Sequence, residues 1–224
     1  MRRVFAAGVI VMAALWADPA AAQSAPASSV PSGPLVNSWY LGVNTGTAVV
    51  EKFGGVVGVE GGMRFWRNLD LIGEIGWVQN SVSARQSYKI DTLARSVAAS
   101  QGGPASGSLK APTTFSGLGG RWVLESAGRF RPYFLVTLGG AKVNLKPSLT
   151  LNGADITSTA AQYGVTLGQD VIGKSNHFAT EGGIGVVSGF GTSWYADVGA
   201  RLLSINADQR VDVARLVFGG GYRF

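Results

Sequence analysis

The sequence lacks cysteine and contains a single histidine, His177. Without cysteine the chain cannot gain stability from disulfides, and one histidine cannot assemble the nitrogen and sulfur ligands of a structural zinc site. We therefore expect no metal and no disulfide. Charge is also scarce, because only 14% of the residues are charged, against about 25% in ordinary soluble domains.

A long apolar run is absent as well. After residue 22 no apolar stretch reaches the roughly 18 residues that indicate a membrane-spanning helix. Glycine, in contrast, is abundant, with 33 of the 224 residues. This composition is typical of a membrane protein, and without spanning helices only a closed β-barrel can pair every backbone polar group in lipid.

The first 22 residues have the three-part layout of a secretory signal peptide. Two arginines precede an apolar run that is shorter than the roughly 20 residues of a spanning helix, and three alanines follow it. We predict that residues 1–22 are a cleaved signal peptide and that the protein is exported. Residues 23–36, rich in serine, alanine and proline, are expected to be a disordered leader. Residues 37–224 are expected to form a single barrel domain.

Alternation of apolar and polar residues predicts the strands of this domain. A tilted membrane strand needs about 9–11 residues, and eight alternating segments are long enough. A soluble β-sandwich would show the same alternation, so the scarcity of charge decides between the two. The predicted strands are 38–48, 55–66, 69–80, 113–124, 131–142, 177–188, 193–204 and 211–224.

The connections between these strands come in two sizes. Short turns at 67–68, 125–130 and 189–192 alternate with longer loops, of which 81–112 and 143–176 are the longest. This layout is typical of outer-membrane barrels. It predicts an all-β fold: an eight-stranded antiparallel transmembrane β-barrel with short periplasmic turns and longer extracellular loops.

In the middle of the predicted strands no charged residue falls on the apolar parity. An arginine or lysine facing lipid at mid-bilayer costs about 2–4 kcal/mol, so we expect the charges to face the lumen. The interior of an eight-stranded barrel is just wide enough for side chains to fill, and buried charges there must be paired. We predict a salt-bridged polar plug made of Glu60, Arg64, Asp70, Glu74, Arg121, Glu181, Asp197, Arg201, Arg215 and Arg223.

A narrow ion channel through this charged lumen is the alternative. Six inward positions are glycine, which would leave pockets for water along the arginine and glutamate side chains. These positions are Gly42, Gly46, Gly58, Gly62, Gly183 and Gly185.

Aromatic residues on the outward parity lie near the strand ends. Outer-membrane barrels carry girdles of aromatic residues at both interfaces, and Trp39, Trp77, Trp122 and Trp194 fit such girdles. The last strand ends in "FGGGYRF", with aromatic residues at alternate positions.

The signal peptide, the eight strands, the alternating turns and loops, and this terminal strand resemble a known family. It is the small outer-membrane β-barrel family that includes the OmpA transmembrane domain, OmpX and opacity-type surface proteins. The resemblance implies a bacterial outer-membrane location, with outer-membrane lipid and lipopolysaccharide as surroundings. It also implies that the barrel-assembly machinery recognises a C-terminal signal formed by Leu216, Phe218, Tyr222 and Phe224.

Catalysis is not expected. Lipid A deacylases among outer-membrane barrels use a His-x-Ser pair with a nearby carboxylate, and His177 shares a face with Glu181. The residue two positions after this histidine is Ala179, so the nucleophile is missing. We predict a non-enzymatic protein without a cofactor and without catalytic residues, and a lipid A-modifying enzyme is the less favoured alternative.

The loop 81–112 is basic and contains a predicted helix at 91–100, with Asp91 as N-cap and Gly102 as the stop signal. Nucleic acid is not an expected partner, because an exported chain meets none and a basic stripe with interleaved aromatic residues is missing. We predict a structural or surface-interaction role through the long loops, with lipopolysaccharide or another extracellular surface ligand as partner. The alternative is a solvated loop without a ligand. Candidate contacts to lipopolysaccharide phosphates are Arg85, Lys89, Arg95, Lys110 and Lys142.

Overall fold

The computed structural model describes residues 38–126, 128–168, 171–207 and 210–224. The predicted signal peptide and leader lie outside the described residues. Among the residues described, no helix combines the length and the apolar composition needed to cross a lipid bilayer.

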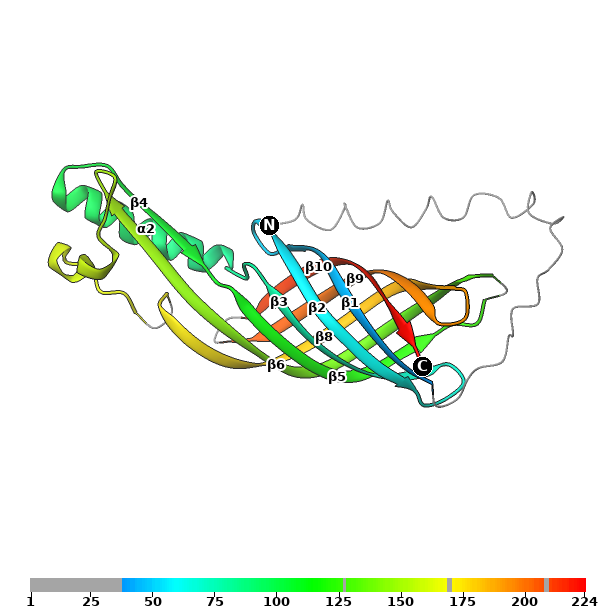
Figure 1. Ribbon diagram of the computed structural model, residues 1–224. Coiled ribbons are helices and arrows are strands. Elements are labelled where there is room, and N and C mark those ends of the chain that lie inside the picture. Colours follow the sequence, from blue (N-terminus) through cyan, green and yellow to red (C-terminus); the bar gives the residue numbers. More distant parts are fainter. Residues whose placement is uncertain (1–37, 127, 169–170, 208–209) are drawn as a thin grey trace, which may run out of the picture. The chain divides into compact units, whose positions relative to one another are not determined.

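Eight long antiparallel strands form a closed ring (Figure 1). Each strand pairs with the next one around the ring, and β1 pairs with β10 from Tyr40–Arg223 to Val49–Ala214. Closure leaves no unpaired strand edge, which confirms the predicted fold class. The ring consists of β1 (Trp39–Val49), β2 (Phe53–Arg64), β3 (Leu69–Val78), β5 (Thr113–Val123), β6 (Phe130–Leu151), β8 (Gly173–Phe190), β9 (Trp194–Asn206) and β10 (Val211–Arg223).

The connections give the ring two different ends. At one end, which we call the turn end, short connections join β2 to β3, β5 to β6 and β8 to β9. At the other, the loop end, the two long connections carry structure of their own: α2 (Ala84–Gln101), β4 (Ala105–Lys110), β7 (Ala154–Asp155) and the 3₁₀-helix η3 (Thr157–Tyr163). The alternation of short turns and long loops is therefore confirmed.

Strand β6 continues well beyond the ring. It pairs with β5 as far as Val143 and then with β4 from Lys146 to Leu151. The resulting β4–β6 hairpin, together with α2 and η3, stands at the loop end (Figure 1), and we call it the extension. This segment falls within the two ranges predicted as loops, 81–112 and 143–176.

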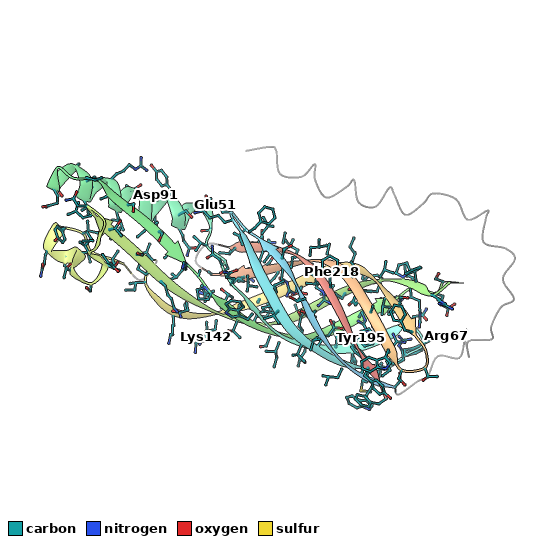
Figure 2. The ribbon with its side chains drawn as sticks, turned by 45° about the horizontal axis from the view of Figure 1, so that its top comes forward. Glu51, Arg67, Asp91, Lys142, Tyr195 and Phe218 are labelled. Carbon is teal, nitrogen blue, oxygen red and sulfur yellow. The ribbon has the colours of Figure 1, made fainter. Side chains whose placement is uncertain are left out.

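Helix α2 begins seven residues earlier than expected, so the prediction of Asp91 as N-cap is wrong. Ser83 caps the helix: its hydroxyl accepts a hydrogen bond from the Gln86 N–H, and the Ser83 N–H donates to Gln86 Oε1 at 3.0 Å. This reciprocal capping box satisfies two backbone donors at once, and Asp91 lies within the helix (Figure 2). The stop at Gly102 is confirmed, with φ of 67° in the left-handed region that favours glycine.

An apolar core of its own holds the extension together. Ile90, Ala94 and Val97 on α2 pack against Leu149 of β6, and residues around η3 complete the cluster. The helix covers the face of the hairpin that continues the inner face of the barrel, since Leu149 has the inward parity of β6. Gly107 on β4 permits the close approach, because a Cβ there would lie 2.7 Å from the Ile90 carbonyl oxygen.

We expect the substitution Gly107→Val to loosen α2 from the hairpin without opening the ring. The added side chain collides with the helix backbone, so the peptide bonds after Arg85, Lys89 and Arg95 become accessible to protease. Limited trypsin digestion should cut the helix faster, while the unboiled protein keeps the shifted gel mobility of a folded barrel. Gly182→Val is the matched control, since a Cβ there meets nothing within 4 Å. Unchanged digestion of the Gly107 variant would contradict the packing.

Candidate functional site

A network of buried ion pairs fills the turn-end half of the lumen. Arg121 on β5 lies at one side of it and is 1% exposed. Its guanidinium donates to Glu60 Oε1 at 2.9 Å and to Asp70 Oδ2 at 3.0 Å. Arg64 also pairs with Asp70. One aspartate thus joins arginines from two strands of the ring.

Arg201 on β9 extends the network across the lumen. Its guanidinium donates to Glu60 Oε2 and Glu74 Oε2, both at 2.9 Å, and lies 3.5 Å from Asp197. Because Glu60 also pairs with Arg121, its carboxylate bridges opposite sides of the ring. Charge-assisted hydrogen bonds of this kind are stronger than neutral ones.

Arg215 completes the network, and Arg223 lies apart from it. Arg215 donates to Glu74 Oε1 at 3.2 Å and pairs with Glu181. Within the described part of the chain Arg223 forms no ion pair, and its guanidinium lies 5.4 Å from the centre of the Tyr195 ring. The structure therefore brings together nine of the ten charged residues singled out in the sequence: Glu60, Arg64, Asp70, Glu74, Arg121, Glu181, Asp197, Arg201 and Arg215.

Tyrosines occupy the space beside the inward glycines. Tyr40 donates to Glu60 at 3.1 Å, and Tyr133 donates to Asp197 at 2.8 Å. A Cβ at Gly62 would lie 2.6 Å from the Tyr40 hydroxyl, and one at Gly185 would lie 2.5 Å from that of Tyr133.

The other inward glycines are filled in the same way. The hydroxyl of Tyr195 lies against Gly42, Asn44 lies against Gly58, and Arg201 lies against Gly183. At Gly46 the backbone of β10 comes close instead. These glycines make room for larger neighbouring groups, and Gly42 also borders a small cavity.

Little free volume is left between these side chains. A cavity beside Glu60, Tyr195 and Arg201 measures about 10 Å³, which is room for about one water molecule.

The loop-end half of the lumen is mostly apolar, although Thr113, Ser175 and His177 share the inward parity there. Sequence reasoning missed this layer. Val78, Val213 and Ile205 are fully buried there, and Phe115 separates them from the ion pairs, with its ring 4.3 Å from the Arg215 guanidinium carbon. The signal was present in the sequence, because these residues share the inward parity of their strands.

His177 lies on the inward side of β8 near the loop end. Its Nε2 is 2.7 Å from the hydroxyl of Ser175, two residues before it. Glu181 lies deeper in the lumen, bound to Arg215 and close to Arg201. Among the described residues no carboxylate hydrogen-bonds to His177, so the third group that orients a catalytic histidine is missing.

The basic residues expected to contact lipopolysaccharide divide between two surfaces. Arg85 and Arg95 are exposed on α2, and Lys89 is half-buried there. Lys110 lies on the outward face of β4, and Lys142 lies on that of β6 (Figure 2). Sequence reasoning missed two further lysines on this outward face. Lys146 pairs directly with Lys110 across the hairpin, and Lys174 on β8 pairs with Asn144. We call the four outward residues Lys110, Lys142, Lys146 and Lys174 the lysine face.

The outer wall of the ring is apolar, and aromatic residues gather at its turn end. The Trp122 ring stacks on Phe134 with 6.1 Å between centroids, and Trp194, Tyr222 and Phe224 pack edge to face. The other residues singled out for the girdles and the C-terminal signal also point outward: Trp39, Trp77, Leu216 and Phe218.

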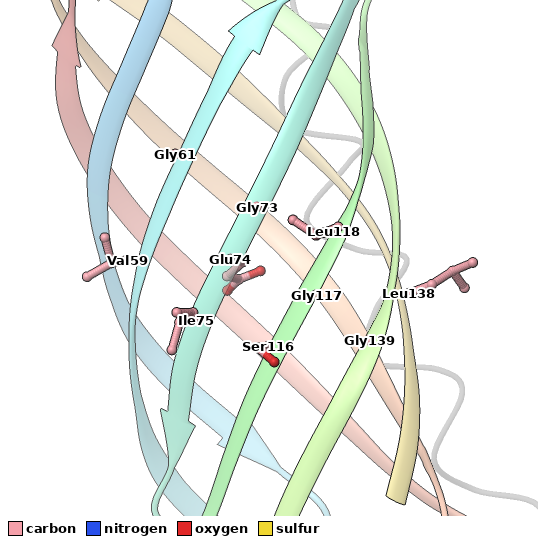
Figure 3. A pocket seen from close by; sticks show the side chains of 10 residues that line it. All are labelled: Val59, Gly61, Gly73, Glu74, Ile75, Ser116, Gly117, Leu118, Leu138 and Gly139. Carbon is pink, nitrogen blue, oxygen red and sulfur yellow. The ribbon is translucent and has the colours of Figure 1, made fainter.

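A hollow interrupts this outer wall across β2, β3, β5 and β6 (Figure 3). It measures about 480 Å³, within the usual range of about 300–1,000 Å³ for ligand pockets. Exposed side chains of Val59, Ile75, Leu118 and Leu138 rise around it. Gly61 and Gly73, which pair directly with each other, are among the residues that line it.

A closed ring of eight antiparallel strands with an apolar outer wall defines a small membrane β-barrel. No protein-family model matches this chain, and no curated protein matches its sequence. Among solved structures, Neisserial surface protein A has a TM-score of 0.51 at 13% identity, over 84% of this chain and 96% of that chain. This similarity shows the fold of the small eight-stranded outer-membrane barrels and confirms the expected resemblance at that level.

Two further structures are similar over most of their length. The attachment invasion locus protein Ail of Yersinia pestis has a TM-score of 0.49 at 11% identity, covering 85% of this chain and 100% of that chain. The N-terminal β-barrel domain of Pseudomonas aeruginosa OprF has a TM-score of 0.48 at 14% identity, covering 84% and 98%.

We expect the substitution Arg201→Met to destabilise the barrel strongly, because it leaves Glu60 and Glu74 each short of a partner. Breaking a buried ion pair costs about 3–5 kcal/mol. Arg223→Met is the matched control, since it removes a cation–π contact worth about 0.5–1 kcal/mol. Urea unfolding in lipid vesicles, followed by tryptophan fluorescence, measures both losses. Equal losses would show that the network does not hold the lumen together.

Proposed function

We propose that this chain is a non-catalytic outer-membrane protein whose extension carries its interactions outside the cell. The observation that supports it most directly is the pairing of a filled lumen with an extension that has its own apolar core. A lumen closed by side chains gives a rigid anchor, and loops on a rigid scaffold are where binding residues concentrate. The loop end is then extracellular and the turn end periplasmic.

The lumen acts as a plug in this proposal rather than as a channel. Ion pairs and tyrosines fill its turn-end half, and aliphatic side chains fill its loop-end half. Both layers oppose ion flow, the first by occupying the volume and the second by offering no partner for a charge.

The remaining expectations from the sequence join this proposal. Outer-membrane lipid and lipopolysaccharide surround the barrel, and the basic residues of α2 face lipopolysaccharide phosphates or an extracellular surface ligand. Leu216, Phe218, Tyr222 and Phe224 serve as the signal for the barrel-assembly machinery. Lipid A chemistry is not proposed, since His177 has only Ser175 as a hydrogen-bond partner among the described residues.

The plug predicts an electrically silent protein. The refolded chain in a planar bilayer should show no conductance steps once insertion has been verified by gel mobility and protease protection. Discrete steps that shift in the Arg201→Met variant would instead make the charged lumen an ion path, and the plug would be wrong.

The proposed orientation can be tested with single thiols, because the chain has no cysteine of its own. Arg95→Cys places a thiol on the exposed side of α2, and Thr192→Cys places one in a turn-end connection. In intact cells a membrane-impermeant maleimide should label the Arg95 variant, whereas the Thr192 variant should react only after lysis. The reverse pattern would invert the barrel, and labelling of both would contradict its insertion.

A further inference from the structure

The hollow in the outer wall is shaped by missing side chains. Along one row of paired outward positions, Leu41 and Leu118 flank Gly61 and Gly73. Neighbouring strands lie about 4.8 Å apart, so two adjacent glycines remove side chains over two strand widths. The exposed side chains around the gap are aliphatic, while Ser116 and the buried Glu74 also line it. A wall that faces lipid here can receive a hydrocarbon chain.

A path of small residues leads from this hollow toward the loop end. Ser116 on β5 belongs to the hollow and pairs directly with Gly140 on β6. Two residues further along β6 lies Lys142, exposed on the same outward face. Because a strand rises about 3.3 Å per residue, Lys142 stands about 13 Å from Leu138 at the edge of the hollow.

Beyond this path lies the lysine face, on which all four charges are positive. Lys110 and Lys146 pair directly across the hairpin, and like charges opposite each other destabilise a sheet unless an anion lies between them. Within the described residues none of the four lysines has an ion-pair partner. Asn144 and Asn176 stand beside them on the same face and add hydrogen-bond donors.

We propose that the hollow and the lysine face together bind one lipid with a phosphorylated headgroup from the outer leaflet. An acyl chain lies in the hollow between Ile75, Leu118 and Leu138. The phosphates lie against Lys142 and Lys174, with Lys110 and Lys146 above them. Continuity of an apolar groove with a cationic surface favours a lipid over a free anionic glycan. This inference rests on the proposed orientation, in which the loop end is extracellular.

The test is native mass spectrometry of the full refolded chain in detergent. The probes are a diphosphorylated lipid A and a phosphatidylcholine with acyl chains of the same length. We expect one retained lipid A per chain and little retained phosphatidylcholine. Lys142→Gln with Lys174→Gln should lower lipid A retention about tenfold or more, since each lysine near an anionic surface contributes about fivefold.

A second variant tests the hollow separately from the charge. Gly61→Phe fills it, and an added Cβ there has its nearest neighbour at 3.5 Å, so the strand accepts the change. Gly182→Phe is its control, an outward glycine of β8 with open space around it. Lys52→Gln is the control for loss of charge. Gly61→Phe should lower lipid A retention several-fold, while both controls should retain it as the parent chain does.

Three results with the lipid probes would overturn the inference, and a fourth with a soluble anion would also do so. The first three are retention of lipid A by the Gly61→Phe variant, retention by the double lysine variant, and equal retention of phosphatidylcholine by the parent chain. Glucose 1,6-bisphosphate, which carries phosphates without acyl chains, is the remaining probe. If it binds with an affinity similar to that of lipid A, and Gly61→Phe leaves this affinity unchanged, the lysines bind a free anion. The proposed lipid site would then be wrong. Thiol labelling of the same proteins distinguishes the two proposals. An inverted orientation would contradict the proposed function. The expected orientation without selectivity for lipid A would contradict only this inference.

Discussion

The antiparallel pairing of β1 with β10 is the constraint on which the rest of the structure depends. A closed ring has no edge, so every backbone group in the wall is paired within the wall. Closure also fixes the role of each side chain, because successive residues of a strand point to opposite faces. One parity must then fill a space just wide enough for side chains, and the other must suit the surroundings of the wall. Position in the strand therefore decides whether a residue meets the lumen or the outside.

Two different kinds of side chain fill the lumen: paired charges in the turn-end half and mainly aliphatic residues in the loop-end half. Around Arg201 the charges are arranged so that each carboxylate accepts from at least one guanidinium, and tyrosine hydroxyls donate to Glu60 and Asp197. Buried ion pairs add little net stability relative to well-packed apolar residues, but removing one partner is costly. The aliphatic layer above them, with Val78, Val213 and Ile205, gains stability by burial in the manner of a soluble core. The charged half thus fixes one arrangement of strands, and the apolar half excludes water from one end of it.

Much of this arrangement could be predicted from alternation, and the failures have identifiable causes. Parity placed all ten charges inside, because a misplaced charge in lipid is expensive. Arg223, near the end of β10, contacts the Tyr195 ring instead of a carboxylate. The helix start was missed although Ser83 and Gln86 have the spacing of a capping box, since Asp91 offered a plausible cap inside the helix. The β4–β6 hairpin was missed because its strand propensity is weak. Packing against Ile90 and Val97 stabilises these strands instead.

Strand β6 keeps the same alternation of inward and outward residues while its surroundings change along its length. Its inward residues run from Tyr133 through Val143 to Leu149 and are mostly buried, first by the lumen and then by α2. Its outward residues change character between Leu138 and Lys142, from aliphatic to cationic, while the inward ones do not. Because only the outward residues change character, the change marks a boundary in what surrounds the barrel. The fold itself continues across that boundary. The strand is continuous across that boundary, so a ligand that is itself apolar below and anionic above matches the wall without any rearrangement of the barrel.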